Sequence, residues 1–277
     1  MHQHNALVSV IIPTFNRRAS LNRAINSVLA QTHPNIELIV IDDGSTDDTF
    51  LHVSAHYPHI TVKKQSNRGV SAARNHGIKI SCGDWLAFLD SDDAWHPDKL
   101  SQQLLLLHDN PSEAICHTNE RWYRHGKFVN PKHKHQKSGG DLFSRALEMC
   151  IISPSSIVIH RSILESVGVF DESLPACEDY DLWLRICAYY KVLYLEQELT
   201  YKYGGHPDQL STKYWGMDRF RIYAIDKLLK QGQLTQIQQQ AAISALKQKI
   251  AIYLIGAKKR AKQQDINYYE ALYAHYA

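Results

Sequence analysis

The chain has 277 residues, 44% hydrophobic content and a formal net charge of +3, which suffice for one large core and argue against nucleic acid as a partner. No stretch approaches the roughly 18 apolar residues of a transmembrane helix, and residues 1–5 show no signal-peptide pattern. Because the five cysteines form no Cys-x-x-Cys pair, they indicate neither a zinc site nor a disulfide framework, and we expect a cytoplasmic protein, soluble or peripheral to a membrane.

Apolar strand-like runs alternate with helical patterns through the first half of the chain. This alternation predicts an α/β fold whose sheet is mostly parallel, with right-handed crossovers. Ser45 or Thr46 is the expected N-cap of the second helix. The expected strands are 7–15, 36–41, 60–64 and 85–89, and the expected helices are 21–29, 45–57 and 70–80.

The second half of the chain is less regular. Residues 114–119 and 155–160 are expected strands, and residues 179–190 are an expected helix. Between them, residues 123–140 are rich in lysine, histidine and glycine. We interpret this segment as a solvated loop, with a lid or a contact to an anionic acceptor as the alternative.

From about residue 213 onward the chain is helical and rich in glutamine. The helix expected over residues 236–257 has apolar residues at helical spacing and is followed by a basic run at 258–262. Its apolar face is expected to pack on the main domain. Alternatively, such a face with a basic end can rest on anionic lipid.

Polar residues follow three of the expected strands in the first half. They are residues 14–17, Asp42 with Asp43, and residues 90–93. Because the carboxyl ends of parallel strands meet at one edge of a sheet, the three clusters together predict a crevice for a polar ligand.

The third cluster, Asp90-Ser91-Asp92-Asp93, contains three carboxylates within four residues. Closely spaced carboxylates repel one another unless a cation lies between them, and hard oxygen ligands suit Mg²⁺ or Mn²⁺. The alternative is an acidic cap on the helix that Pro97 and Asp98 introduce.

Five segments resemble, in order, the motifs of family 2 glycosyltransferases, which have the GT-A fold. The resemblance implies a GT-A domain over residues 1–213, with a nucleotide-sugar half at about 1–95 and an acceptor half at about 96–213. A helical extension over residues 214–277 lies outside the resemblance. The matching segments are 8–17, 37–47, 67–77, 90–93 and 178–185.

The resemblance implies metal-dependent transfer of a sugar, with inversion, from a nucleotide diphosphate sugar, and family frequency favours UDP. A divalent metal, Mn²⁺ or Mg²⁺, would offset the charge that develops on the leaving diphosphate. Asp92 is the first choice for its ligand, with Asp90 and Asp93 sharing the metal, its waters and the donor ribose. His206 either approaches the metal or diphosphate or is an ordinary surface group.

The nucleoside pocket is implied at the first two clusters. Thr14 and either Asp42 or Asp43 are expected to line it, because a carboxylate there can accept the ring N–H of uracil or thymine. A tight turn with a helix cap is the alternative for this aspartate pair. Arg74 is expected at the diphosphate or base, with a solvent-facing arginine as the alternative. The remaining expected donor contacts are Pro13, Asn16, Arg17, Asp90 and Ser91.

Inversion by direct displacement needs a base that removes the proton of the acceptor hydroxyl. Asp179 matches the family's base position, and an acidic helix N-terminus is the alternative for the cluster that contains it. The Gln-x-x-Arg-Trp motif of processive members is missing, which favours adding one sugar or a few. The sequence also lacks the glycine-rich loops that bind ATP and dinucleotides.

Family habit places such enzymes in bacterial envelope polysaccharide, lipopolysaccharide or capsule synthesis. The expected partners are a nucleotide-sugar donor and a carbohydrate or lipid-linked sugar acceptor, with peripheral contact at the cytoplasmic face of the inner membrane as a further option. The oligomeric state is left open. A non-catalytic nucleotide-sugar-binding module and a membrane-associated scaffold are the alternatives to an enzyme.

Overall fold

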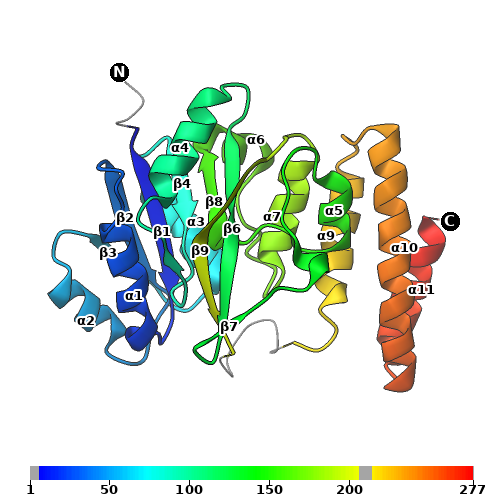
Figure 1. The fold of residues 1–277 in the computed structure, drawn as a ribbon. Coiled ribbons are helices and arrows are strands. Elements are labelled where there is room, and N and C mark those ends of the chain that lie inside the picture. The colour runs from blue at the N-terminus through cyan, green and yellow to red at the C-terminus, as the bar shows by residue number, and fades with distance from the viewer. Residues whose placement is uncertain (1–5, 206–213, 277) are drawn as a thin grey trace.

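One sheet runs through the protein in the computed structural model, which describes residues 6–205 and 214–276 (Figure 1). Its strands lie in the order β3-β2-β1-β4-β8-β6-β9-β5, and β7 pairs with β6. Their bounds are β1 (Val8–Thr14), β2 (Ile36–Asp42), β3 (Thr61–Lys64), β4 (Trp85–Phe88), β5 (Ala94–Trp95), β6 (Ile115–Arg124), β7 (Lys127–Val129), β8 (Ile157–His160) and β9 (Leu193–Gly204).

Parallel pairing is concentrated in the first half of the chain. The pairs β1–β2, β1–β4 and β2–β3 are all parallel. The predicted parallel sheet is therefore confirmed for this region. β8 then runs antiparallel to β4 and to β6, whereas β6 and β9 are parallel. The short strands β5 and β7 pair antiparallel with β9 and β6.

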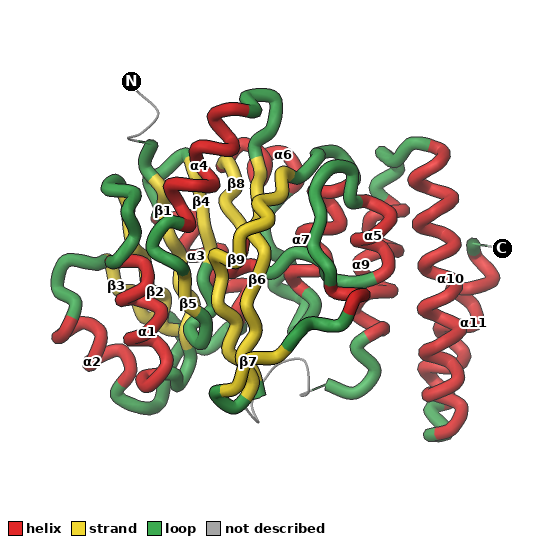
Figure 2. Tube along the Cα trace, in the orientation of Figure 1, coloured by secondary structure: helices red, strands yellow, loops and turns green. Residues whose placement is uncertain are grey.

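Helices cover both faces of the sheet (Figure 2). Successive side chains of a strand point to opposite faces, so Val10 and Ile12 of β1 pack with Leu21 and Ile25, while Ile11 belongs to a second core. The helices are α1 (Arg18–Leu29), α2 (Thr49–His56), α3 (Val70–Ile80), α4 (Lys99–Asp109), α5 (Phe143–Glu148), α6 (Arg161–Val167), α7 (Glu178–Cys187), α9 (Asp218–Lys230), α10 (Gln236–Lys259) and α11 (Gln263–His275).

Helix α3 packs closely on β1 through Gly77. A Cβ atom at Gly77 would lie 2.4 Å from Cγ2 of Ile11, which is fully buried. Gly77→Ala is therefore expected to destabilise the protein by about 1–3 kcal/mol, because overpacking shifts the helix from the strand. The urea midpoint should fall while the slope of the transition stays unchanged.

Gly256 in α10 provides the matched control, because it is also a glycine inside a helix. Its Cβ would meet only the flexible tip of Arg260 at 3.3 Å and Trp215 at 3.6 Å. Gly256→Ala is expected to leave stability unchanged or to raise it slightly, since alanine favours helix. Equal effects of the two substitutions would contradict the close approach of α3 to β1.

The predicted N-cap of the second helix is wrong. Helix α2 begins at Thr49, and the preceding Asp48 makes no capping hydrogen bond. Ser45 instead donates its backbone N–H to Oδ1 of Asp42 at 2.7 Å, and its hydroxyl accepts from the backbone N–H of Asn16 at 2.9 Å. The segment is thus a turn at the end of β2. The hydroxyl of Ser45 binds the loop after β1 and does not cap the helix that follows it.

The expected solvated loop over residues 123–140 is only partly such a loop. It contains the end of β6, the strand β7 and a 3₁₀ turn at His133–His135. Lys137 is buried in an ion pair with Glu120 of β6, with 3.1 Å between Nζ and Oε1. The prediction of a solvated segment is wrong for this lysine, because basic composition alone does not reveal a buried partner.

The C-terminal helices share one hydrophobic core with α5, α6, α7 and β8, and α10 packs against α5, α9 and α11. Figure 1 shows α10 and α11 at the end of the molecule opposite β3 and α2. The expected packing of the apolar face of residues 236–257 on the main domain is therefore confirmed. Across the described part of the chain, no helix combines the length and the apolar character needed to span a membrane.

Candidate functional site

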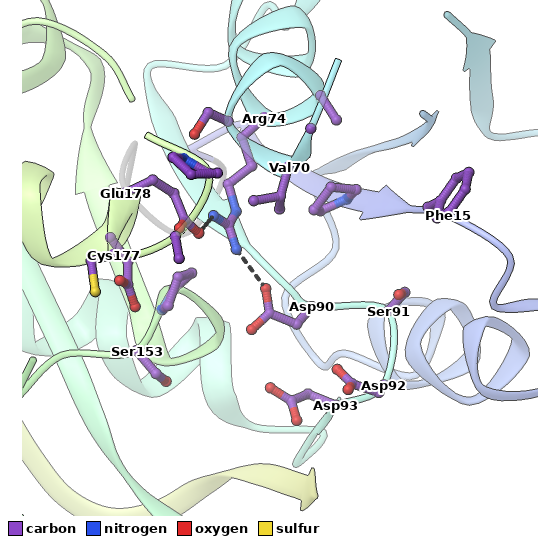
Figure 3. A pocket seen from close by; sticks show the side chains of 18 of the residues that line it. Phe15, Val70, Arg74, Asp90, Ser91, Asp92, Asp93, Ser153, Cys177 and Glu178 are labelled. Carbon is purple, nitrogen blue, oxygen red and sulfur yellow. Dashed lines mark hydrogen bonds and ion pairs between the residues drawn. The ribbon is translucent and has the colours of Figure 1, made fainter. Parts of the chain in front are cut away.

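A large cavity opens where β1, β2 and β4 end. Its volume is about 1510 Å³, above the roughly 300–1,000 Å³ of an ordinary small-molecule site, so it has room for two substrates. Figure 3 shows Arg74, Asp90 and Glu178 meeting at one wall of it. The sequence-predicted residues among its lining are Pro13, Thr14, Asn16, Arg17, Asp43, Arg74, Asp90, Ser91, Asp92, Asp93 and Asp179.

Thr14 and Asp42 are neighbours at the ends of β1 and β2, where the parallel register pairs them directly. Both are buried, and Thr14 Oγ1 and Asp42 Oδ2 have no hydrogen-bond partner in the described part of the chain. Buried polar atoms are nearly always hydrogen-bonded. Thr14 lines the cavity, so its hydroxyl identifies a place where a polar ligand can complete the hydrogen bonding, whereas the fully buried Asp42 does not reach the cavity lining.

Asp43 uses both carboxylate oxygens within the protein. Oδ1 accepts from Gln65 Nε2 at 2.8 Å and from the backbone N–H of Arg68 at 2.9 Å, and Oδ2 accepts from the backbone N–H of Gly69 at 2.8 Å. Asp43 thus holds the segment that leads into α3. Of the two aspartates in this pair, only Asp42 keeps an unpartnered oxygen.

Asn16 fixes the loop after β1 to the loop after β2. Its φ of 52° lies in the left-handed region, which asparagine tolerates better than most residues. Its Oδ1 accepts from the backbone N–H of Thr46 at 2.8 Å. The two strand-end loops are therefore held together at the rim of the cavity.

Ser71, in the first turn of α3, also lines the cavity. The residue is 3% exposed, and within the described residues its hydroxyl has no hydrogen-bond partner. A helix N-terminus attracts negative charge, so this hydroxyl and the dipole favour an anionic group here. Sequence analysis missed Ser71 as a separate site residue, although it lies within the third matching segment.

Arg74 links two acidic segments beneath the cavity. Its Nη2 lies 2.8 Å from Oδ1 of Asp90 and its Nη1 lies 2.7 Å from Oε1 of Glu178 (Figure 3). Burial opposes the charge, but the two carboxylates outweigh it and raise the pKa of Arg74. The side chain is 4% exposed, so the solvent-facing alternative is wrong.

The acidic cluster contains a lysine that the sequence did not predict. Lys202 of β9 places Nζ 2.6 Å from Oδ2 of Asp93 and 3.4 Å from Oδ2 of Asp90. Asp93 also accepts from Ser155 Oγ at 2.6 Å and from the backbone N–H of Tyr203 at 3.1 Å. Burial opposes ionisation of Asp90, yet Lys202 and Arg74 lower its pKa to about 2.

Asp92 differs from its neighbours because its carboxylate forms no ion pair with any described residue. The cluster leads into β5 and α4 begins only at Lys99, so the helix-cap alternative for residues 90–93 is wrong. No group of three or more His, Cys, Asp or Glu side chains in residues 6–205 and 214–276 is arranged to hold a metal. One open carboxylate instead fits a metal whose other ligands are diphosphate oxygens and water.

Asp179 lies in the first turn of α7 and lines the cavity. Its Oδ1 accepts from the backbone N–H of Tyr180 at 2.7 Å, and its Oδ2 accepts from Cys150 Sγ at 3.3 Å. Glu178 pairs with Arg74, and Asp181 pairs with Arg185 at 2.9 Å. The three acids of this turn therefore have different partners, and the carboxylate of Asp179 is the one without an ion pair among the described residues.

Residues from the second half of the chain supply the remaining wall of the cavity. Trp122 is held by its indole N–H, which donates to Glu120 Oε2 at 2.8 Å, and Ser153 donates to Glu120 Oε1. Burial opposes ionisation of Glu120, but Lys137 and Lys202 lower its pKa to about 2. The other residues of this wall include Arg124, Val129, Cys150, Tyr214, Met217 and Arg221.

The structure bears differently on His206 and on the segment after residue 213. His206, expected near the metal or diphosphate, lies outside the described residues. Tyr214, Met217 and Arg221 line the cavity although they belong to the segment assigned to the helical extension. The extension is thus part of the site as well as of the core.

Comparisons with known proteins show which family this chain resembles. The model of Glycosyl transferase family 2 matches residues 9–168. An uncharacterized glycosyltransferase of Rickettsia felis is 34% identical over 71% of this chain and 33% of its own length. The Escherichia coli UDP-Glc:alpha-D-GlcNAc-diphosphoundecaprenol beta-1,3-glucosyltransferase WfgD is 34% identical over 65% of this chain and 69% of its own length.

Solved structures support the same assignment of fold. S. aureus TarS 1–349 in complex with UDP-GlcNAc has a TM-score of 0.67 at 20% identity, over 98% of this chain and 91% of that one. The mannosyltransferase PcManGT from Pyrobaculum calidifontis, in complex with GDP-Man and Mn2+, has a TM-score of 0.61 at 19% identity, over 97% and 81%.

The chain spans between 31% and 66% of the length of the Rickettsia relatives that it matches. The family model nevertheless covers more than half of the chain, and the predicted α/β architecture agrees with the solved structures. The protein therefore belongs to glycosyl transferase family 2 and has the GT-A fold.

Proposed function

We propose that this protein is a metal-dependent, inverting and non-processive glycosyltransferase that moves one sugar from a nucleoside diphosphate sugar to an acceptor hydroxyl. One observation carries the proposal: the same cavity is lined by the end of β1, by Asp92 and by Asp179, and neither aspartate forms an ion pair with a described residue. A donor pocket, a metal ligand and a base are the three parts that this reaction needs.

The donor nucleoside is assigned to the ends of β1 and β2. Thr14 and Asp43 both line the cavity, so a carboxylate oxygen of Asp43 suits a ring N–H of uracil and Oγ1 of Thr14 suits a carbonyl or ribose hydroxyl. UDP is the first choice of nucleotide, because WfgD uses UDP-Glc by name and TarS binds UDP-GlcNAc. Ser71 and the N-terminus of α3 would then face the diphosphate.

Asp92 is assigned as the protein ligand of Mn²⁺ or Mg²⁺. When bound, the metal would neutralise charge on the departing diphosphate. The chain's own residues prepare this position: Arg74 and Lys202 hold Asp90 and Asp93, so Asp92 is the carboxylate left open toward the cavity. Arg17, Asn16, Pro13 and Ser91 are assigned to the donor side of the same rim.

Asp179 is assigned as the base. It would take the proton of the acceptor hydroxyl as that oxygen attacks the anomeric carbon, on the side opposite the leaving diphosphate. The thiol of Cys150 holds Oδ2 at 3.3 Å and the backbone N–H of Tyr180 holds Oδ1 at 2.7 Å, so the carboxylate is oriented before substrate binds.

A lipid-linked sugar is the acceptor we assign, because the named acceptor of WfgD is a GlcNAc linked to diphosphoundecaprenol. The wall formed by Trp122, Arg124 and Arg221 combines an aromatic ring with two guanidinium groups, which suits a sugar diphosphate. Such an acceptor favours action at the cytoplasmic face of the inner membrane, in envelope polysaccharide, lipopolysaccharide or capsule synthesis. The protein would contact that surface peripherally.

Asp92→Asn is expected to remove the metal dependence of nucleotide binding. Wild-type protein should bind UDP more tightly with Mn²⁺ than with EDTA, whereas the variant should bind it equally weakly in both, because a neutral amide is a poor metal ligand. Asp98→Asn is the matched control, since Asp98 is 46% exposed and does not line the cavity. A persistent Mn²⁺ effect in Asp92→Asn would contradict the metal assignment.

Calorimetric titration with UDP, GDP and dTDP, each with Mn²⁺ and with EDTA, tests the donor site as a whole. We expect metal-dependent binding of UDP alone. Binding of GDP or dTDP instead of UDP would change the nucleobase that we assign to the donor. Failure of all three nucleotides to bind folded protein would overturn the proposal. Tight UDP binding without transfer or slow donor hydrolysis would favour a non-catalytic binding module instead.

A further inference from the structure

Lys202 occupies an unusual position, because it is a lysine inside the acidic cluster that we assign to the metal. Its Nζ lies 2.6 Å from Asp93 Oδ2 and 3.4 Å from Asp90 Oδ2. The side chain is 27% exposed, whereas Asp93 is 1% exposed. The ammonium group is therefore between a buried carboxylate and the cavity, where it also belongs to the lining.

The sheet fixes this position. Lys202 lies opposite Trp122 in the parallel ladder of β6 and β9, and its neighbour Tyr201 lies opposite Ala94 of β5, one residue after Asp93. The backbone N–H of Tyr203 then donates to Asp93 Oδ1 at 3.1 Å. Backbone pairing on both sides of Lys202 thus holds the lysine against the cluster.

The charges of the cluster are nearly balanced by the protein itself. Asp90, Asp92 and Asp93 bring three carboxyl groups together, and Lys202 and Arg74 form ion pairs with two of them, Asp90 and Asp93. Arg74 also pairs with Glu178, and Lys202 also acts on the nearby Glu120, but the two ion pairs that Lys202 forms among the described residues are both with this cluster. A divalent cation that approaches Asp92 therefore meets a fixed positive charge and little excess negative charge.

We propose that Lys202 is a positioning residue that makes metal binding conditional on a nucleoside diphosphate. The free protein takes up the divalent cation weakly, and the diphosphate supplies the missing negative charge, so that cation and diphosphate bind together. This inference rests on the proposed function, since it takes Asp92 as the ligand of the metal. It adds a residue that controls when the metal is held.

A purely structural role for Lys202 would produce a different result. If the lysine only fastened β9 to the cluster, its removal would loosen the loop and weaken metal binding or leave it unchanged. If it acts as the counter-ion, its removal leaves Asp93 without a cation and Asp90 with Arg74 alone, and the loss of a positive charge strengthens metal binding in the absence of nucleotide. The direction of the change therefore separates the two roles.

The experiment is a titration of Mn²⁺ into the full chain, followed by electron paramagnetic resonance of the free ion, with and without UDP. Lys202→Met is expected to bind Mn²⁺ without nucleotide at least ~10-fold more tightly than wild type, because a nearby like charge has been removed. Lys202→Arg keeps the charge and is expected to stay close to wild type.

Lys227→Met is the matched control. Lys227 is 25% exposed and also pairs with two carboxylates, 2.7 Å from Asp171 and 2.6 Å from Asp181, but it does not line the cavity. It is expected to leave Mn²⁺ binding unchanged. An affinity of Lys202→Met for free Mn²⁺ equal to or weaker than that of wild type would overturn the inference.

If Lys202→Met fails to fold, the affinity of the wild-type protein for Mn²⁺, measured with and without UDP, still tests the inference. Mn²⁺ should bind at least ~10-fold more tightly with UDP than without it, and equal affinities would overturn the role of Lys202. Failure of Mn²⁺ to bind even with UDP would instead overturn the metal assignment on which the inference rests. The two failures are therefore distinguishable.

Discussion

Asp179→Asn is expected to lower the transfer rate by a factor on the order of 10² or more while leaving the affinity for UDP unchanged. The asparagine has nearly the same shape but cannot take the proton of the acceptor hydroxyl. Asp179 forms no ion pair within the described residues, so its replacement should leave the fold intact. The rate is measured as transfer of labelled sugar at saturating donor and acceptor.

Cys150→Ser is the control for this substitution. A serine hydroxyl can still donate to Oδ2 of Asp179, as the thiol does at 3.3 Å, so the rate should change only a few-fold. A rate within a few-fold of wild type in Asp179→Asn would show that the base lies elsewhere. Loss of UDP binding in the same variant would show that Asp179 serves the donor instead.

Arg74→Met is expected to destabilise the protein by about 3–5 kcal/mol and to weaken UDP binding, because it leaves the buried Glu178 unpaired and leaves Asp90 with only its 3.4 Å contact to Lys202. Arg74 ties Asp90 to Glu178, and these residues adjoin the proposed metal ligand and the proposed base. Removing it should therefore disturb both halves of the site. Urea unfolding and calorimetry at a temperature where the variant is folded measure the two effects.

Arg185→Met separates the loss of stability from the loss of the site. Arg185 is also buried and pairs with Asp181 at 2.9 Å, but it is not part of the cavity lining. Asp181 keeps its ion pair with Lys227 at 2.6 Å, so Arg185→Met should lower stability mainly through lost hydrogen bonds to the backbone oxygens of Val167, Gly168 and Val169. It should leave UDP binding per folded molecule unchanged. Adding Glu178→Gln to Arg74→Met should restore part of the stability, and no recovery would contradict the unpaired-charge explanation.

The first half of the fold could be predicted because its strands are continuous apolar runs. The run at 85–89 corresponds to β4 and the helix expected over residues 70–80 corresponds to α3. A strand that is buried on both faces has a continuous apolar sequence whichever strands it pairs with, so it can be recognised from its own residues. The polar residues that follow them were correctly expected at one edge, because parallel pairing brings strand ends together.

The second half could not be predicted to the same extent. Strand β9 was missed because its twelve residues include charged and half-exposed positions without a clean alternation. Strand β6 extends to Arg124, beyond the expected end at 119, because β9 and β7 pair with its polar end. Pairing between distant segments decided these elements, and local pattern carries little information about it.

The site residues that sequence analysis missed have the same origin. Lys202 reaches Asp93, and Cys150 reaches Asp179, only after the chain has folded. Neither residue belongs to a local motif. Arg74 was identified, but its link to Asp90 and Glu178 was not, because spacing along a sequence does not show which charges meet.

Transfer of labelled glucose from UDP-Glc to GlcNAc-diphosphoundecaprenol, with Mn²⁺ and with EDTA, tests the central claim most directly. We expect a product that forms only with metal and whose new linkage is β, because an α-linked donor is inverted. An α-linked product, or equal transfer in EDTA, would contradict the proposed mechanism. If this lipid-linked acceptor received no sugar while the protein bound UDP and hydrolysed the donor, the acceptor assignment would be wrong.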